Sequence, residues 1–365
     1  MNLDDLSLIR QLDPQNMRGE LEGLPEQLAR AWKLGQTFAE QTSEVLETSE
    51  VSEASGISRV VISGMGGSAI GADLLAAYCA QTCPVPVIVH RDYGLPAFAK
   101  GSETLFIASS HSGNTEETLD SFDHARQAGC TVMAICTGGA LAGRAEAAGA
   151  PVWRFQHEGQ PRAAVGYSFG LLLALFARLG LIPAQDELVS GAVAAMKRSQ
   201  QHFRPEVPTV KNPPKRYAGQ LMGRLVTIVA SGYLGPVARR WKTQINELAK
   251  AAATFEILPE ADHNTLEGLM FPENTLNAHS MTMFLRAPSD HPRNRLRSDL
   301  TRQAFLLEGL NTDFTDGRGD SPLAHMWTLI LFGDYMAYYL AIAYGVDPTP
   351  VPALGSLKEA LRGRG

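Results

Sequence analysis

SRVVISGMGGSAIGADLLAAYCAQ, residues 58–81, begins with a short run of β-branched residues, passes through glycines and continues with apolar residues at helical spacing. This order is typical of a buried strand that ends in a turn and leads into a helix. We therefore expect the strand–turn–helix unit from which parallel α/β sheets are built.

The same alternation continues along the chain on both sides of this stretch. Apolar runs of strand length occur at 85–90, 103–110, 130–136 and 151–156, and helical patterns occur at 114–129 and 162–180. Strands that alternate with helices predict a parallel sheet with helices on both faces.

The pattern then returns in the second half of the chain. Residues 224–249, RLVTIVASGYLGPVARRWKTQINELA, again read as strand, glycine turn and helix, and residues 279–309 as strand, polar turn and helix. A helical stretch near 185–216 joins the two halves. The predicted fold class is therefore α/β, with two consecutive parallel-sheet sandwiches of three layers each.

Composition and charge exclude several classes of protein. The chain has 365 residues, 45% of them hydrophobic, and a formal net charge of −6, which does not favour a nucleic-acid partner. Its first residues lack the basic and apolar regions of a secretory signal. The apolar stretches 167–181 and 326–342 are interrupted by Arg178 and Asp334, which favours buried helices over membrane spans. We expect a cytoplasmic protein without a membrane partner.

The four cysteines give no reason to expect a metal. Cys79 and Cys83 are loosely spaced like metal ligands, but no second pair lies nearby, and Cys130 and Cys136 have no histidine at a metal-binding spacing. We expect reduced thiols and no metal or cofactor.

Residues 105–118, LFIASSHSGNTEET, carry an unusual cluster of hydroxyl side chains where a strand ends. Ligands of open α/β sheets bind at this end of the strands, and a helix that starts here directs free N–H groups at an anion. Ser110, Ser112 and Thr115 would add hydroxyl donors. The second half has APSDHPRNRL (287–296) at the equivalent place, so the cluster occurs once, as expected of a phosphate site rather than of an ordinary helix cap.

A second glycine-rich turn follows the first predicted strand and supplies Gly66, Gly67 and Ser68. By itself it is a weak dinucleotide-binding pattern. No acidic residue ends a clear second strand, where only Asp92 is available, so a nucleotide cofactor is disfavoured.

Five motifs in order resemble the bifunctional phosphoglucose/phosphomannose isomerases, a family built from two sugar-isomerase (SIS) domains. They are GMGGSAIGADL, SSHSGNTEETL, PRAAVGYSFG, NELAKAAATFEILPEADHNTLEG and GVDPTPVPALGSLKEAL, and they extend from about residue 60 to the C-terminus. The resemblance implies an N-terminal helical lead-in (1–48), a first SIS domain that binds phosphosugar (49–185), a linker helix region (186–215), a second SIS domain (216–347) and a C-terminal helix (348–365).

The resemblance also implies an activity, the interconversion of glucose 6-phosphate, and of mannose 6-phosphate, with fructose 6-phosphate. The reaction opens the sugar ring and moves a proton between C2 and C1 through a cis-enediolate. A carboxylate base and a cation are sufficient for this step, so no metal or redox cofactor is expected.

Site residues follow motif by motif from the resemblance. Glu247 is the expected base, Arg162 stabilises the enediolate, and His263 opens the ring in the site of a neighbouring subunit, which implies a homodimer with shared active sites. Lys358 assists at the ring oxygen, and Thr349 is the candidate for accepting mannose 6-phosphate. The expected phosphate contacts are Gly67, Ser68, Ser110, Ser112 and Thr115.

Some assignments remain open. Glu256, Glu260 and Glu267 are rival carboxylates near Glu247, and His111, where the family usually has tyrosine or another residue, is expected to line the site in an unknown role. Three other functions are possible: an aminating sugar-phosphate isomerase, a non-catalytic sugar-phosphate-binding SIS module, and an NAD(P)-dependent oxidoreductase.

Overall fold

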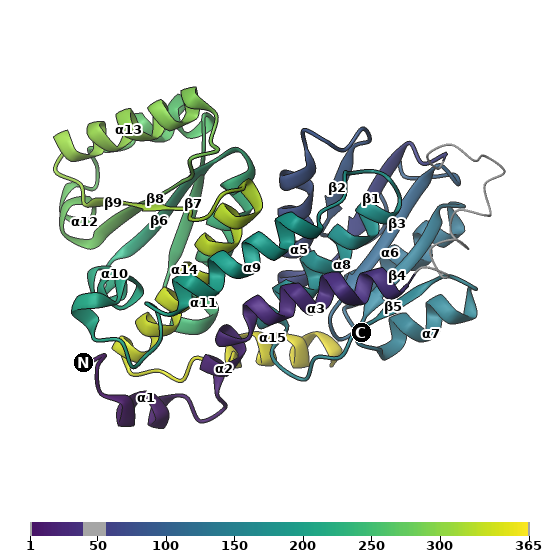
Figure 1. The fold of residues 1–365 in the computed structure, drawn as a ribbon, viewed down its shortest axis with the longest axis horizontal. Coiled ribbons are helices and arrows are strands. Elements are labelled where there is room, and N and C mark those ends of the chain that lie inside the picture. The colour runs from purple at the N-terminus through teal and green to yellow at the C-terminus, as the bar shows by residue number, and fades with distance from the viewer. Residues whose placement is uncertain (1, 39–55, 364–365) are drawn as a thin grey trace.

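A computed structural model describes residues 2–38 and 56–363 and contains two α/β domains joined by long helices (Figure 1). The predicted boundary between residues 48 and 49 lies outside the described residues. The chain begins with α1 (Leu6–Leu12), α2 (Met17–Glu22) and α3 (Leu24–Thr37).

The first domain has a five-stranded parallel sheet in the order β2-β1-β3-β4-β5. Its elements are β1 (Arg59–Ser63), α5 (Gly66–Cys79), β2 (Val87–His90), β3 (Thr104–Ser110), α6 (Glu116–Gln127), β4 (Thr131–Cys136), α7 (Gly139–Ala147), β5 (Val152–Arg154), the 3₁₀ turn η1 (Pro161–Ala163) and α8 (Val165–Arg178).

The second domain has a four-stranded parallel sheet in the order β7-β6-β8-β9. Between the domains lie α9 (Asp186–Gln200) and η2 (Thr209–Lys211). The second domain contains α10 (Pro213–Leu221), β6 (Leu225–Ser231), η3 (Gly232–Leu234), α11 (Gly235–Ala249), β7 (Ala253–Leu258), η4 (Glu260–His263), η5 (Thr265–Glu267), α12 (Glu273–His279), β8 (Ser280–Arg286), α13 (Pro292–Leu307), β9 (Thr312–Asp316) and α14 (Pro322–Tyr344). Two consecutive parallel sheets confirm the predicted fold class.

Each sheet lies between helical layers, as the alternation of buried side chains requires. On β1, Val60 and Ile62 pack into the main core with α5, α8 and α3, whereas Val61 packs with Phe106 and Phe122 on the side of α6 and α7. Successive side chains of a strand point to opposite faces, so both faces of this sheet are apolar and covered.

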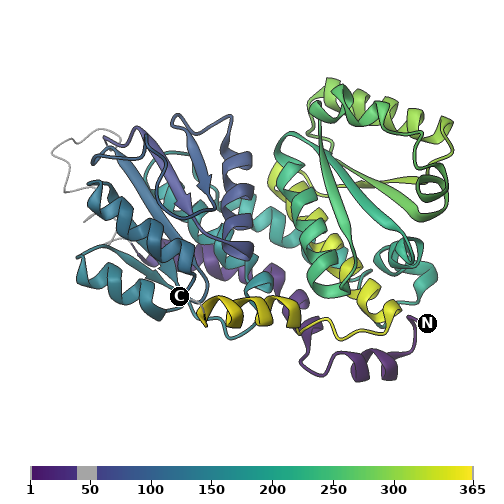
Figure 2. The same ribbon diagram turned by 180° about the vertical axis from the view of Figure 1, so that it is seen from behind.

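One core joins the two domains through helices that are buried on all sides. The α8 helix packs against α3 and α5, and α14 packs against α9, α10 and α11 (Figure 2). Among the described residues, α14 is the one helix long and apolar enough to cross a membrane, and its apolar window is wholly buried inside the protein. The apolar stretch 326–342 is therefore a buried helix, as its sequence predicts.

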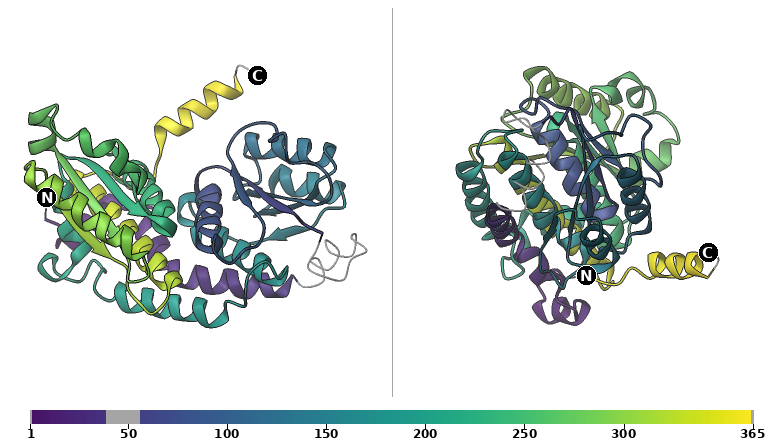
Figure 3. Two further views of the ribbon diagram at one scale, coloured as in Figure 1. Left: turned by 90° about the horizontal axis from the view of Figure 1, so that it is seen from above. Right: turned by 90° about the vertical axis from the view of Figure 1, so that its right-hand side faces the viewer.

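The last helix, α15 (Pro352–Arg362), extends away from the rest of the molecule (Figure 3). Three of its leucines share one face, and all three are about half exposed: Leu354 (46%), Leu357 (57%) and Leu361 (56%). The helix therefore has an apolar face that the described part of this chain leaves uncovered.

Candidate functional site

The hydroxyl-rich turn between β3 and α6 is held by hydrogen bonds among its own side chains. The hydroxyls of Ser110 and Thr115 lie 2.9 Å apart, and the backbone N–H of Gly113 donates to Ser110 Oγ at 3.1 Å. Ser68 joins the turn from the start of α5, because its hydroxyl accepts from the N–H of His111 at 3.1 Å. The structure thus brings Ser68, Ser110 and Thr115 together at the carboxyl ends of β1 and β3.

Two glycines are required for these close approaches. Gly113 has φ +66°, and a Cβ there would lie 1.8 Å from the Gly138 carbonyl oxygen in the loop after β4. A Cβ on Gly67 would lie 2.5 Å from the carbonyl oxygen of Pro161, which precedes Arg162. The start of α5 and the turn that carries Arg162 are therefore in backbone contact.

Thr115 is the N-cap residue of α6, yet its side chain does not cap the helix. Its hydroxyl pairs with Ser110 instead, so the first N–H groups of α6 keep their capacity to bind an anion. This arrangement favours the phosphate site over the ordinary helix cap that the sequence also allowed.

Arg162, in η1, is buried between the two domains. Its Nη2 donates to the carbonyl oxygens of Pro348, at 3.1 Å, and Thr349, while Nη1 lies 3.9 Å from Glu247 Oε2. Burial lowers the pKa of Arg162, and the neighbouring carboxylates of Glu247, Glu20 and Asp347 oppose that shift. The guanidinium is therefore a desolvated cation facing the predicted base.

A buried ion pair from the second domain supports Arg162. Arg240 on α11 donates two hydrogen bonds of 3.2 Å to the Arg162 carbonyl oxygen, and its guanidinium also contacts Asp334 on α14 at 2.6 Å. Gln244 donates to the same carboxylate at 3.0 Å. Asp334 therefore stabilises the buried core and is not a catalytic residue, as its place in an apolar helix suggests.

Glu247 lies in the last turn of α11 and lines a mostly apolar cavity of about 450 Å³. The cavity is also lined by Lys250 and by the start of α15, Pro352 to Leu354. The Arg162 guanidinium, from the first domain, faces this carboxylate across 3.9 Å. Glu247 and Arg162 are thus adjacent although they come from different domains.

Thr349 has a buried hydroxyl that no described residue hydrogen-bonds. Its backbone is fixed, because its N–H donates to Asp347 Oδ1 at 2.8 Å and its carbonyl oxygen accepts from Arg162. A buried unpaired hydroxyl is costly to leave unsatisfied, so a ligand hydroxyl is a reasonable partner for it.

The structure places two other predicted residues apart from this cluster. His263, at the end of η4, and Lys358, on α15, are exposed, and no residue that the structure describes hydrogen-bonds either side chain. Ser112 stays in the turn, where its hydroxyl accepts from the N–H of Asn114 at 3.2 Å. The rivals Glu260 and Glu267 are exposed on the surface.

Sequence reasoning missed three residues at or near the site. Lys250 adopts φ +56° at the end of α11, and its Nζ donates to the carbonyl oxygens of Glu247 and Pro348 at 2.7 and 3.3 Å. Burial and the nearby Arg162 lower its pKa. Its place in the NELAK motif could have revealed it. Glu20 and His157, which adjoin His111, carry no motif signal.

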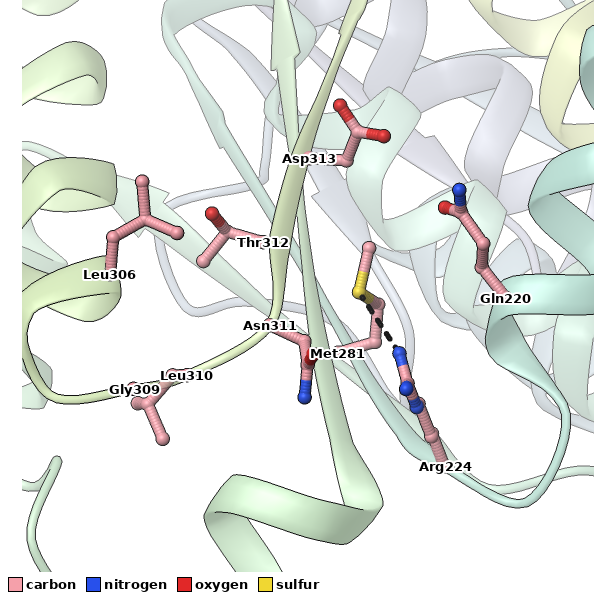
Figure 4. Close-up of a pocket in the computed structure, with 9 residues that line it drawn as sticks. All are labelled: Gln220, Arg224, Met281, Leu306, Gly309, Leu310, Asn311, Thr312 and Asp313. Atoms are coloured by element: carbon pink, nitrogen blue, oxygen red, sulfur yellow. Dashed lines mark hydrogen bonds between the residues drawn. The ribbon is translucent and has the colours of Figure 1, made fainter.

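Another cavity, of about 480 Å³, lies at the amino ends of β8 and β9 (Figure 4). Its lining includes Arg224, Met281 and Asp313, and one contact, Arg224 Nη1 to Met281 Sδ at 3.8 Å, crosses it. None of the predicted site residues lines it, and it lies at the opposite edge of the sheet from the strand ends where α/β ligands bind.

Comparison with known proteins identifies relatives over nearly the whole chain. Residues 210–361 match the family described as bacterial phospho-glucose isomerase C-terminal SIS domain. The bifunctional phosphoglucose/phosphomannose isomerase of Caldicellulosiruptor bescii is 41% identical over 93% of this chain and 96% of the relative. The protein of the same name from Aquifex aeolicus is 31% identical over 83% of this chain and 90% of the relative.

The fold also matches solved structures. The C-terminal domain of glucosamine-fructose-6-phosphate aminotransferase from Francisella tularensis superposes with a TM-score of 0.69 and 13% identity, covering 91% of this chain and 97% of that chain. At this level of identity the similarity concerns the fold alone.

Proposed function

Because this chain belongs to the bifunctional phosphoglucose/phosphomannose isomerase family, we propose that it interconverts glucose 6-phosphate and mannose 6-phosphate with fructose 6-phosphate. The observation that supports this most strongly is the Glu247 carboxylate on a cavity wall, 3.9 Å from the buried Arg162 guanidinium. An aldose–ketose isomerase needs a base and a cation placed together in this way.

Phosphate binding is assigned to the turn that follows β3. The hydroxyls of Ser68, Ser110, Ser112 and Thr115, the Gly67 backbone and the start of α6 together offer donors to an anion without a lysine. A phosphate held there anchors one end of the substrate, so that the carbons at the other end are presented to the acid–base groups.

Proton transfer is assigned to Glu247. An ionised carboxylate takes the proton from the carbon next to the carbonyl and returns it to the neighbouring carbon, while Arg162 offsets the negative charge on the enediolate oxygens. Thr349 is assigned to the C2 hydroxyl, whose position distinguishes the two aldoses. Its own hydroxyl is buried and has no hydrogen-bond partner within the described part of the chain. Lys358 is assigned to the ring oxygen.

Ring opening is assigned to His263 of a second subunit. Within one chain His263 is exposed and outside the Glu247 cluster, so it completes a site only if another copy supplies it. The uncovered leucine face of α15, whose first turn lines the Glu247 cavity, supports the same conclusion, because a second copy would bury it. The proposed active form is therefore a homodimer with shared sites.

The proposal is tested by incubating the purified protein with fructose 6-phosphate and following the sugars by NMR. The proposal predicts that both glucose 6-phosphate and mannose 6-phosphate appear, without added metal or nucleotide. A parallel sample with ammonium tests the aminating alternative. The isomerase assignment fails if glucosamine 6-phosphate forms only with ammonium and neither aldose appears.

A further inference from the structure

His111 lies inside the hydroxyl turn, and its ring begins a chain of hydrogen bonds that leaves the site. His111 Nε2 lies 2.9 Å from His157 Nδ1, and His157 Nε2 lies 3.1 Å from Glu20 Oε2. Glu20 comes from α2, whereas His157 lies in the loop between β5 and η1. Three segments that are distant in the sequence therefore meet at one line of polar side chains.

The carboxylate at the end of this chain sets the direction of both hydrogen bonds. An ionised carboxylate only accepts, so His157 must carry its proton on Nε2. In a neutral ring His157 Nδ1 is then an acceptor, and His111 must donate from its own Nε2. Burial and the neighbouring His157 lower the pKa of His111 to about 4, which keeps this ring neutral at pH 7.

Aromatic side chains hold the two imidazoles in place. Phe155 and Tyr167 stack with ring centroids 5.0 Å apart, His111 meets Phe155 edge-on at 5.8 Å, and His157 meets Tyr167 at 5.8 Å. The His111 backbone is fixed as well, because its carbonyl oxygen accepts from Thr137 Oγ1 at 2.7 Å. The imidazoles thus connect the hydroxyl turn with the loop that leads to Arg162.

We propose that Glu20, His157 and His111 form a relay of positioning residues, which orients the hydroxyl turn for the sugar phosphate and ties it to the loop that carries Arg162. The proposal rests on the proposed function only for the identity of the ligand. The three side chains do not take part in proton transfer at the sugar. They fix the turn in the geometry that binds phosphate before the substrate arrives, so their loss weakens substrate binding more than turnover.

Gly159 offers a way to break the relay without changing any of its members. A Cβ at Gly159 would lie 2.0 Å from Glu20 Oε1, the mobile end of a flexible side chain, and Gly159 does not have a positive φ. Gly159→Ala should therefore displace the carboxylate from His157. Gly143→Ala on α7 is the matched control, because a Cβ there meets no atom within 4 Å.

The first readout is the protonation of the ring nitrogens by ¹⁵N NMR of the imidazoles, assigned with His111→Gln and His157→Gln. In the wild type and in Gly143→Ala, the Nε2 of both rings should carry a proton. Gly159→Ala should redistribute the His157 proton between the two nitrogens. This readout does not depend on turnover, so it stands even if the substrate is a different sugar phosphate.

The second readout is binding, measured with fructose 6-phosphate and with inorganic phosphate. Gly159→Ala and Glu20→Ala should raise KM, and the Kd for inorganic phosphate, about tenfold with kcat within about threefold, as expected for one lost hydrogen bond to a charged group. Glu20→Gln, whose amide oxygen can still accept from His157, should stay within about threefold of the wild type. Unchanged ring protonation and unchanged phosphate affinity in Gly159→Ala would overturn the relay, as would equal losses in Glu20→Gln and Glu20→Ala.

Discussion

Arg162 contacts more of the site than any other predicted residue. Its side chain faces the Glu247 carboxylate and binds the Thr349 carbonyl oxygen, and its own carbonyl oxygen accepts from Arg240 on α11. Its Nη2 is engaged by two carbonyl oxygens, while its Nε is buried without a partner among the described residues. A substrate oxygen is therefore the natural partner for the remaining donor capacity of the guanidinium.

Arg162→Gln should lower kcat by roughly 10²–10³, because the charge that develops on the enediolate loses its cation. KM for fructose 6-phosphate should change little, since the phosphate is bound by the turn. Steady-state kinetics with a melting curve for each variant check this. Arg144→Gln, at an exposed ion pair with Asp123, is the control for loss of an arginine and should leave kcat unchanged.

Single residues were predictable where a motif surrounded them and not where only packing brought them together. Glu247 and Arg162 were predicted from their motifs, and the structure places them side by side. Lys250 enters the site because α11 ends in a left-handed residue that turns its ammonium group back towards the helix carbonyls. Glu20 approaches the site only through the packing of the N-terminal helices, which no local pattern reveals.

At the scale of elements, the turn between β3 and α6 differs from its counterpart in the second domain by its hydroxyl network. Ser110→Ala combined with Thr115→Ala removes both hydroxyls of the 2.9 Å pair. The hydrogen bonds that these hydroxyls would donate to the substrate phosphate persist from the ground state to the transition state. KM for phosphorylated sugars should therefore rise more than kcat falls. Equal KM values for the double variant and the wild type, in the same assay, would refute phosphate binding at this turn.

The equivalent turn after β8 contains Asp290, whose carboxylate accepts from the N–H of Ala287 at 2.7 Å. Burial raises the pKa of Asp290 to about 6, although the Ala287 N–H and Arg295 oppose the shift. The folded state therefore binds more protons than the unfolded state between pH 4 and 6, and this residue's contribution to stability falls as pH rises through that window.

Asp290→Asn should remove the loss of stability that ionisation of Asp290 causes between pH 4 and 6. The melting temperature of the variant, relative to the wild type, should increase from pH 4 to pH 6 and then level off. Melting curves at several pH values measure the difference, with Asp123→Asn, in the ion pair between α6 and Arg144, as control. A difference that stays constant over the window would show that Asp290 ionises as it does in the unfolded chain.

Most strands and helices could be predicted from periodicity, because apolar runs of strand length and glycine turns alternate regularly. The helical pattern read at 114–129 is α6, which begins at Glu116, after the Thr115 N-cap. The linker helix region expected at 186–215 contains α9, which also packs against α14 and α3 in the shared core. Linear patterns do not reveal such contacts between distant elements.

At the scale of the whole molecule, the two domains form a cluster that neither contains alone: Arg162 comes from the first domain, Glu247 from the second and Thr349 from the segment after α14. The sequence predicts both domains but not their relative orientation, which follows from burial of α8 and α14 in one core. His263 stays exposed in this arrangement. That it completes the site of a second subunit therefore stays a prediction.

The homodimer can be tested with two inactive variants, Glu247→Gln and His263→Ala. If His263 serves the partner's site, a hybrid of the two variants has both lesions in one site and an intact second site. Mixing the variants under subunit exchange should restore up to about half of the activity per hybrid dimer. A tagged pull-down controls for exchange, and exchange without recovery would place both residues in the site of one subunit.

The most direct test of the account is exchange of the C2 hydrogen of glucose 6-phosphate in deuterated water, followed by NMR. An ionised carboxylate can accept this proton, whereas the amide of Glu247→Gln cannot. The account predicts exchange in the wild type and in Glu256→Gln, Glu260→Gln and Glu267→Gln, with a loss of roughly 10²–10⁴ in Glu247→Gln. Exchange at the wild-type rate in Glu247→Gln would contradict it.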